Sequence, residues 1–291
     1  MNAGDDGTSA DAAVIIPAYD EERVIGRCLE ALTPHTQPGS SPRVEVVVAA
    51  NGCHDRTADV ARSHRGVTVL DIPIGSKSLA LNEGDGAASA FPRIYLDADI
   101  ALSPEALPAL VAALSGPEPL VAAPRIRFDL SRSSWPVRAF YRVFSELPYV
   151  KDGLVGLGVY GLSRAGRERF ERFPDLVADD LYVQRLFAPE ERRVTSGTFT
   201  VAAPRTLKSL LAVRVRVAKG NAGLAAHDDD AKFAASTTST GRALVDLLRR
   251  RPTLAPSVAV YLAVTLAARA RARRRSARHA GTWERDDSTR S

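Results

Sequence analysis

Four short apolar runs, rich in β-branched residues, alternate with helical patterns along the first hundred residues. The apolar runs are Ala13–Ile16, Val44–Ala49, Val67–Ile72 and Arg93–Leu96. The segments with helical spacing are Glu21–Leu32, Thr57–Ser63 and Ser78–Ala90. Short continuous apolar runs are typical of strands that are buried on both faces. Their alternation with helices predicts an α/β fold with a doubly wound, mainly parallel sheet and flanking helices.

The pattern continues for two more elements and is then lost. Ser103-Pro104-Glu105 offers an N-cap, a proline at the first helical position and an early acid, which predicts a helix as far as Leu114. A strand is expected at Leu120–Ala123. We expect residues 124–204 to cover the sheet and to supply an acceptor pocket from an aromatic stretch, Trp135–Tyr149, and a glycine-rich stretch, Lys151–Gly161.

The last quarter of the chain has a different composition. Asp228–Thr240 is polar and small, which indicates a linker, so we predict a domain at residues 1–240 and a basic helical C-terminal tail at residues 241–291. Within the tail, Thr253–Ala268 carries no charge and has arginines on both sides. This segment is shorter than the roughly 20 residues of a membrane span. Two interpretations stay open: a helix at a membrane interface and a helix docked on the protein body.

Composition narrows the class of protein and its compartment. With 291 residues and 45% hydrophobic content, the chain is long enough to bury a substantial core. Its two cysteines, Cys28 and Cys53, provide no disulfide framework. Residues 1–12 contain acids and no Lys or Arg, unlike a signal peptide. We therefore expect a cytoplasmic protein, located at the inner face of the plasma membrane if the tail contacts lipid.

The formal net charge of +5 is divided unevenly along the chain. Arg242–Ser291 contains twelve arginines and four acids, a net charge of +8, which leaves −3 for the first 241 residues. An acidic body argues against nucleic acid as a partner. The basic tail is the part suited to peripheral membrane contact.

Polar residues follow four of the predicted strands. The runs are Pro17-Ala18-Tyr19-Asp20-Glu21, Ala50-Asn51-Gly52-Cys53-His54-Asp55, Gly75-Ser76-Lys77 and Asp97-Ala98-Asp99. Ligands of open α/β sheets bind outside the carboxyl ends of the strands, so these residues should share one crevice. Two carboxylates one residue apart can hold a hard cation such as Mg²⁺ or Mn²⁺. We therefore expect a metal site at Asp97 and Asp99.

Together these runs resemble family 2 glycosyltransferases, which have a GT-A fold. IPAYDEE is similar to the family's Pro-x-Tyr-Asn-Glu run, ANGCHDRT to its Asp-Gly-Ser-x-Asp run, and YLDADI to its Asp-x-Asp. Lys77 with Ala80-Leu81-Asn82 is similar to its Lys and Ala-Leu-Asn segment. The resemblance spans residues 12–223. It implies a hexosyltransferase that moves a sugar from a UDP- or GDP-sugar to an acceptor hydroxyl, with inversion and a divalent metal.

The resemblance also implies roles for individual residues. Residues expected to border the nucleotide are Pro17, Ala18, Tyr19 and Glu21. Asn51 is expected to meet the base, Lys77 to lie near the base or phosphates, and Asp97 to contact the ribose and share the metal with Asp99. The family usually has two consecutive acids where this chain has Ala50-Asn51. An amide both donates and accepts hydrogen bonds, so base recognition is expected while the identity of the base stays open.

Two later runs extend the resemblance. Ala178-Asp179-Asp180-Leu181 is similar to the motif that carries the general base, for which Asp180 is the first choice and Asp179 the second. The alternative is that both acids are N-terminal charges on a helix. In Arg214–Gly220, Arg216 matches the Arg of a later family motif, although Val217 stands where Trp is usual. Arg216 is expected to offset diphosphate charge, and a plain basic face is the alternative.

Two other functions stay open. A sugar-nucleotide nucleotidyltransferase can share the nucleotide-binding half and an acidic metal site. It would need a glycine-rich loop with an arginine after the first strand, where this chain has Asp20-Glu21-Glu22. The other is a membrane or nucleic-acid binding module that acts through the basic tail.

Overall fold

The four predicted strands form one half of the sheet. The computed structural model describes residues 9–151, 158–175, 179–225 and 240–276. These strands are β1 (Ala12–Ala18), β2 (Val44–Asn51), β3 (Val67–Ile72) and β4 (Arg93–Leu96). The helices between them are α1 (Ile25–Leu32), α2 (Thr57–Arg62) and α3 (Lys77–Ala87). Each strand and helix overlaps the predicted segment. α1 begins four residues later than predicted because the chain first makes a turn, in which the amides of Val24 and Ile25 bond the carbonyl of Glu21.

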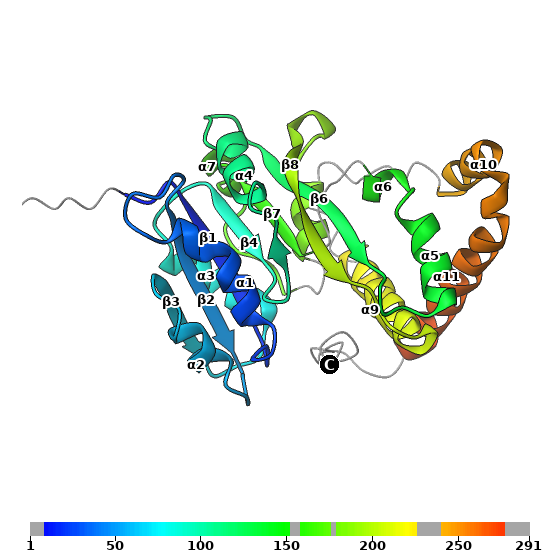
Figure 1. Cartoon of the computed structure of the whole chain (residues 1–291), viewed down its shortest axis with the longest axis horizontal. Helices are drawn as coiled ribbons and strands as arrows, with labels where there is room; N and C mark the ends of the chain where they lie inside the picture. Colours follow the sequence, from blue (N-terminus) through cyan, green and yellow to red (C-terminus); the bar gives the residue numbers. More distant parts are fainter. Residues whose placement is uncertain (1–8, 152–157, 176–178, 226–239, 277–291) are drawn as a thin grey trace, which may run out of the picture.

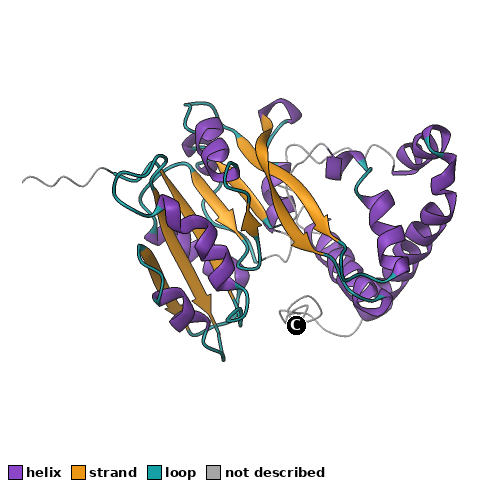
Figure 2. Cartoon of the chain, in the orientation of Figure 1, coloured by secondary structure: helices purple, strands orange, loops and turns teal. Residues whose placement is uncertain are grey.

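Four more strands complete a sheet of eight. They are β5 (Ala101–Leu102), β6 (Val121–Asp129), β7 (Val159–Leu162) and β8 (Arg192–Ala202), in the order β3-β2-β1-β4-β7-β6-β8-β5. β7 is antiparallel to β4 and β6, and β5 is antiparallel to β8, while the other neighbours are parallel. Residues 124–204 were expected to cover the sheet, and this expectation was incomplete, because much of β6, β7 and β8 lies in that segment and extends the sheet itself (Figures 1 and 2).

Helices cover both faces of the first sheet half. Because successive side chains of a strand point to opposite faces, Val14 and Val46 pack with α1 and α4 (Ala106–Leu114) on one side. Ile15 and Val47 pack with Leu81 of α3 on the other. The predicted doubly wound, mainly parallel α/β architecture is confirmed.

The predicted start of α4 was wrong. Ser103 was expected to cap the helix, but its hydroxyl accepts a hydrogen bond from the amide of Thr198 in β8 at 2.9 Å. Its own amide donates to the carbonyl of Thr198 at 2.8 Å. Ser103 therefore continues the pairing of β5 with β8, and the helix begins at Ala106.

A second core lies at the far end of the molecule from β1–β3 (Figure 1). It is formed mainly by α5 (Trp135–Phe144), α9 (Leu207–Ala225), α10 (Thr240–Arg250) and α11 (Ala255–Ser276), which we call the helical unit. The short helices α6 (Pro148–Lys151), α7 (Arg164–Arg167) and α8 (Asp179–Arg185) complete the described chain, with 3-10 turns at Thr33–His35, Pro189–Glu191 and Pro252–Leu254.

The helical unit includes elements from both sides of residue 240. Phe140 of α5 stacks on Tyr261 of α11 with ring centroids 5.1 Å apart. The predicted boundary at residue 240 therefore does not coincide with a break in packing. The aromatic residues Phe140, Tyr141 and Phe144, expected near an acceptor, are buried in this core instead. Residues 228–239 of the predicted linker lie outside the described residues.

Candidate active site

Lys77 lies in a small pocket at the carboxyl ends of β1 and β4, which we call the strand-end pocket. Its Nζ is 3.0 Å from Oδ1 of Asp97 and 3.0 Å from Oδ1 of Asp179. Lys77 begins α3, where the Ser76 hydroxyl accepts a hydrogen bond from the amide of Leu79 at 3.2 Å. Burial lowers the pKa of Lys77, but the charges of Asp179 and Asp97 outweigh it and raise that pKa above its ordinary value. The charged ammonium therefore joins the end of β4 to α8.

The two acids at the start of α8 have different surroundings. Asp179 is 4% exposed, and its Oδ2 accepts a hydrogen bond from the Tyr160 hydroxyl at 3.2 Å. Asp180 also lines the strand-end pocket and is partly exposed. Burial, followed by the negative charge of Asp179, raises the pKa of Asp180 to about 7, while Lys77 acts in the opposite direction. A carboxylate with this pKa is suited to general base catalysis near neutral pH.

Asp97 and Asp99 flank a turn directly after β4. The amide of Asp97 donates to the carbonyl of Gly158 at 2.7 Å, and the amide of Ile100 donates to the carbonyl of Asp97 at 3.1 Å. The Asp97 side chain is 38% exposed, and Asp99 is also partly exposed. After burial itself, the charges of Asp99 and Asp97 are the main causes that raise the pKa of the nearby Cys28 thiol. Two accessible carboxylates one residue apart in the sequence offer the oxygen ligands that Mg²⁺ and Mn²⁺ prefer.

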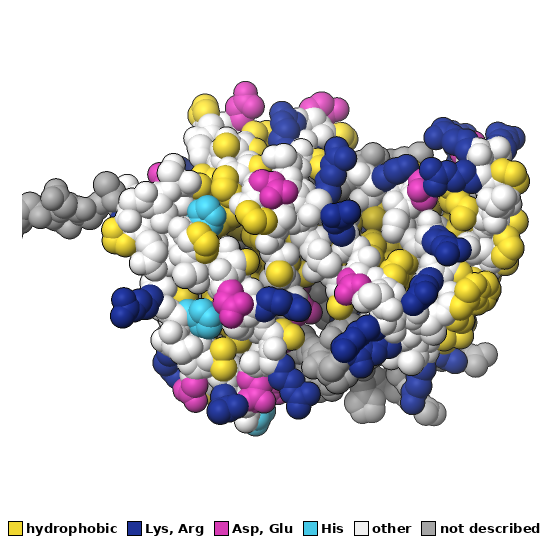
Figure 3. Space-filling model, viewed as in Figure 1, with side chains coloured by type: hydrophobic (Ala, Val, Ile, Leu, Met, Phe, Trp, Pro, Cys, Tyr) yellow, Lys and Arg dark blue, Asp and Glu magenta, His cyan; other side chains and the backbone are white. Residues whose placement is uncertain are grey.

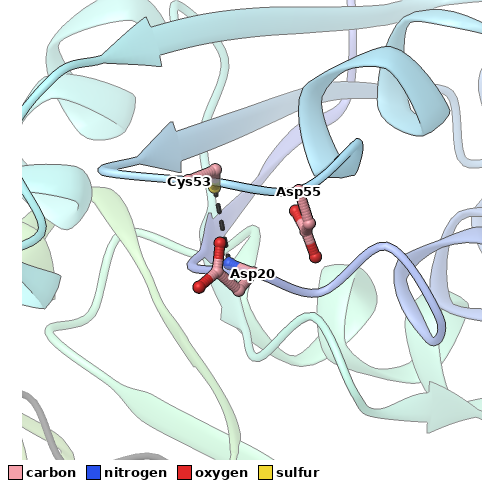
Figure 4. A group of neighbouring side chains, drawn as sticks. All are labelled: Asp20, Cys53 and Asp55. Carbon is pink, nitrogen blue, oxygen red and sulfur yellow. Dashed lines mark hydrogen bonds between the residues drawn. The ribbon is translucent and has the colours of Figure 1, made fainter.

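A second group of possible metal ligands, Asp20, Cys53 and Asp55, joins the loops after β1 and β2 (Figure 4). Their ligand atoms lie within 4.8 Å of one another. The Cys53 thiol donates to the carbonyl of Ala18 at 3.4 Å and accepts from the amide of Asp20 at 3.5 Å, while Asp55 accepts from the amide of Glu22 at 3.1 Å. Burial raises the pKa of Cys53, so the thiol stays protonated at neutral pH. This chemistry fits a hydrogen-bonded tie between loops better than a hard cation site.

Asn51, the last residue of β2, connects the end of β1 with the loop before α3. It has no exposed surface, and its Nδ2 donates to the carbonyl of Ala18 at 2.8 Å. Its Oδ1 accepts a hydrogen bond from the amide of Ser76 at 3.0 Å. An ionised carboxylate could accept from Ser76 but could not donate to Ala18, so an acid would not serve here. Contact between the Asn51 side chain and a base would require these bonds to break.

The remaining predicted residues of the β1 loop differ in accessibility. Pro17 lines the strand-end pocket, while Ala18 and Glu21 are buried. The Tyr19 ring lies against Gly75, where an added Cβ would be 3.1 Å from Tyr19 Cε2. A side chain at position 75 would therefore push the ring away. The structure thus brings the β1 loop and the loop before Lys77 into direct contact, as the strand-end prediction required.

Arg216 lies on α9 and is not among the residues that line the strand-end pocket. Its neighbour Val215 packs on Ala268 and Ala272 of α11, and the Arg214 guanidinium lies 5.1 Å from the centre of the Phe144 ring. This part of α9 therefore belongs to the helical unit. The expected contact of Arg216 with a diphosphate stays a prediction.

Gly158 and Tyr160 also line the strand-end pocket. Both lie in the glycine-rich stretch Lys151–Gly161, which was expected to help form an acceptor pocket, although neither residue was named individually. Tyr160 of β7 lies near the end of this stretch and pairs opposite Tyr95 of β4, with ring centroids 5.1 Å apart. Gly158 has φ +108, and an added Cβ would lie 2.9 Å from Ile100 Cγ1 and 3.3 Å from Asp97 Oδ2. An aromatic residue in a short apolar run between two glycines was the available signal. Its orientation depends on a pairing that short-range patterns do not reveal.

The segment that contains these strand ends matches the sequence model of a known protein family. A family model described as Glycosyl transferase family 2 matches residues 13–171, more than half of the chain. The chain belongs to glycosyl transferase family 2. The family match includes Lys77, Asp97 and Asp99 and ends before α8, so Asp179 and Asp180 lie beyond it.

Two curated relatives align with different lengths of this family 2 chain. Glycosyltransferase AglE of Haloferax volcanii is 34% identical over 110 residues, which are 36% of this chain and 35% of that protein. The 4,4'-diaponeurosporenoate glycosyltransferase of Staphylococcus aureus is 28% identical over 209 residues, or 68% of this chain and 52% of that protein. The chain therefore spans about half or less of these relatives.

A solved structure supports the family 2 fold over nearly the whole chain. Mannosyltransferase PcManGT from Pyrobaculum calidifontis, determined in complex with GDP-Man and Mn²⁺, superposes with a TM-score of 0.60 and 23% identity. The alignment covers 93% of this chain and 81% of that protein. At this identity the comparison establishes the shared GT-A architecture.

Proposed function

We propose that the chain transfers a sugar from a nucleoside diphosphate sugar, with a UDP- or GDP-sugar as donor, to an acceptor hydroxyl with inversion at the anomeric carbon. The observation that carries this proposal is the strand-end pocket. There Lys77 joins Asp97, at the Asp-x-Asp turn, to Asp179, beside the pKa-shifted Asp180. One pocket thus combines carboxylates that can hold the metal of a sugar donor with a base that can take the proton of an acceptor hydroxyl.

On the donor side, Asp97 and Asp99 would hold Mg²⁺ or Mn²⁺, because they are accessible oxygen ligands on one turn. Such a cation supplies charge stabilisation to the leaving diphosphate. Pro17 and Tyr19, with the buried Ala18 and Glu21 behind them, border the nucleotide. Asn51 acts by holding the loops that receive the base, and Arg216 with Lys219 approaches the diphosphate from α9.

On the acceptor side, Asp180 takes the proton as the acceptor O–H bond breaks. The acceptor oxygen forms a bond to the anomeric carbon, and the bond from that carbon to the diphosphate oxygen breaks on the opposite face. The nucleoside diphosphate leaves with the electron pair. Asp179 stays paired with Lys77, and its negative charge helps to keep the pKa of Asp180 high enough for proton transfer.

Release of nucleoside diphosphate from a panel of UDP-, GDP- and dTDP-sugars, with Mn²⁺ and simple hydroxyl acceptors, tests this function. We expect turnover with at least one donor and its loss in Asp99→Asn, while Asp71→Asn, an exposed acid on β3, serves as the matched control and retains turnover. Equal release by the wild-type protein and Asp99→Asn, or no release with any donor, would contradict the proposal.

A further inference from the structure

α11 is apolar on both sides, but only one side is covered by the protein. Val258, Tyr261 and Val264 are buried in the helical unit. On the opposite side, Leu262 is 43% exposed and Leu266 is 62% exposed. We call this side the outer face of α11, formed by Ala255, Ala259, Leu262, Ala263 and Leu266, all exposed and spaced three or four residues apart or next to one another. Figure 3 shows hydrophobic side chains gathered over this helix.

Arginines lie at both ends of the outer face. Arg249, Arg250 and Arg251 precede the helix, and Arg269 and Arg273 continue the same face at its other end. Between Leu247 and Ser276 the sequence contains eight arginines and no acidic residue. An apolar stripe with cations at its ends complements a surface that offers acyl chains flanked by anionic headgroups.

We propose that the outer face of α11 docks on an anionic lipid bilayer, with the helix axis in the plane of the membrane. Pro252–Arg273 is long and apolar enough to cross a membrane by length and composition. However, its other side packs on α5, whose Arg138 and Arg142 are exposed. A spanning orientation would carry those charges into the hydrocarbon, whereas an interfacial orientation leaves them in water.

A second copy of the chain is a less favourable occupant of the same face. In a two-fold symmetric pair, the outer face would meet itself. An antiparallel arrangement would bring Arg249–Arg251 of one copy near Arg269 and Arg273 of the other, and a parallel one would oppose each group to itself. Asp246 and Glu146 pair with Arg249 and Arg251 at 3.6 and 3.1 Å and weaken this repulsion, but the stretch from Leu247 to Ser276 itself contains no acid that would cancel it.

Vesicle flotation of the full chain tests the docking. We expect the protein to float with phosphatidylcholine vesicles that contain phosphatidylglycerol, and binding to weaken as salt is raised. Leu266→Glu should reduce partitioning by at least about tenfold, because a charge replaces an apolar side chain in the interface. Arg273→Gln should reduce it by about fivefold, the equivalent of one headgroup interaction.

Ile74→Glu is the matched control, because Ile74 is 63% exposed and lies in the loop after β3, outside the helical unit. It should float like the wild-type protein. The melting temperature of each variant shows whether it is folded, and both apolar sites are exposed enough that folding should be preserved.

Four results would overturn the proposal. The first is no flotation of the wild-type protein with anionic vesicles, and the second is equal flotation of Leu266→Glu and Ile74→Glu. The third is a wild-type dimer in vesicle-free buffer that Leu266→Glu converts to a monomer. The fourth is binding of another kind, either to vesicles in a form that resists both high salt and alkaline carbonate, as expected of a spanning helix, or to a DNA duplex in place of vesicles.

Discussion

At the carboxyl ends of β1 and β4 the chain buries charged groups against one another, whereas the helical unit buries aromatic rings and exposes arginines such as Arg138 and Arg142. In the strand-end pocket, Lys77 lies between two carboxylates, and an adjacent carboxyl has its pKa raised to about 7. In the helical unit, Phe140 stacks on Phe144 and Tyr261. Burial therefore disfavours the ionised carboxylate in the strand-end pocket, whereas burial of aromatic rings stabilises the helical unit.

This difference predicts that the two regions respond oppositely to substitution. Changes in the strand-end pocket should affect turnover more than folding, because a site that buries charge gives up stability for function. Changes in the core of the helical unit should affect folding more than turnover, because its rings contribute mainly packing. Four substitutions test this contrast.

Asp180→Asn has the largest expected effect. We expect turnover to fall by about 10²- to 10⁴-fold, the usual contribution of a general base, while donor affinity is retained. In the wild-type protein, turnover should rise as the pH passes through about 7, since only the ionised carboxylate accepts a proton. The measurement is the initial rate of nucleoside diphosphate release from pH 5 to 9. Unchanged turnover in Asp180→Asn would assign the base elsewhere.

The same variant should be more stable than the wild-type protein at high pH. Because the folded pKa of Asp180 is raised, its contribution to stability is present below the unfolded pKa of about 4 and is lost as pH rises through about 7. Asparagine carries no such charge. Melting temperatures of the two proteins should agree near pH 4 and diverge at pH 8, with Asp180→Asn higher.

Phe140→Ala should destabilise the protein by about 3–5 kcal/mol, because it removes a fully buried ring from the aromatic core. Turnover per folded molecule should stay near the wild-type value. Trp135→Ala on the same helix is the control, since Trp135 is 63% exposed and its loss should cost roughly 0.5 kcal/mol or less. Urea unfolding measures both. Equal destabilisation by the two variants would remove the contrast between the regions.

Lys77→Met should move the pH midpoint of turnover upward by about one unit. The positive charge of Lys77 lowers the pKa of Asp180, so its removal leaves burial and Asp179 unopposed. Lys77→Arg keeps the charge and should keep the midpoint near its wild-type position. A midpoint that stays constant in Lys77→Met would show that the two groups are not coupled.

Tyr160→Phe has the smallest expected effect, a loss of about 1 kcal/mol in the free energy of unfolding at neutral pH, because Asp179 loses one hydrogen bond. Turnover should fall only a few-fold, since Lys77 still holds Asp179. Denaturant titration and the rate assay measure the two effects. A loss as large as that of Asp180→Asn would give Tyr160 a direct role.

The strands and their polar ends were predictable because the signal is local. Continuous apolar runs identify β1–β4, and parallel pairing brings their carboxyl ends to one edge of the sheet. β8 was missed because Thr195 and Phe199 are its only buried residues and it contains Arg192 and Arg193, so it lacks a continuous apolar run. Its pairing with β5 and β6 is a long-range property that short windows do not contain.

At the site, the polar residues expected at the carboxyl ends of the strands lie there, but their bonding partners were not predictable from the sequence. The Asn51 amide bonds the carbonyl of Ala18 at the end of β1 and the backbone amide of Ser76 before α3, and its contact with a base stays a prediction. The ion pair of Lys77 with Asp179 joins residues far apart in the chain. For Thr253–Ala268, two interpretations were left open. The structure shows one side of α11 packed on the protein and the other side exposed. The docked helix therefore describes the first side, and membrane contact stays a proposal for the second.

Calorimetric titration with UDP- and GDP-sugars, with and without Mn²⁺, tests most directly whether the strand-end pocket is a metal-dependent donor site. The account predicts saturable binding of at least one donor by the wild-type protein, weakened at least about tenfold without Mn²⁺ and to a similar extent in Asp99→Asn. Binding of equal affinity in Asp99→Asn, or no binding of any donor in the presence of Mn²⁺, would contradict it.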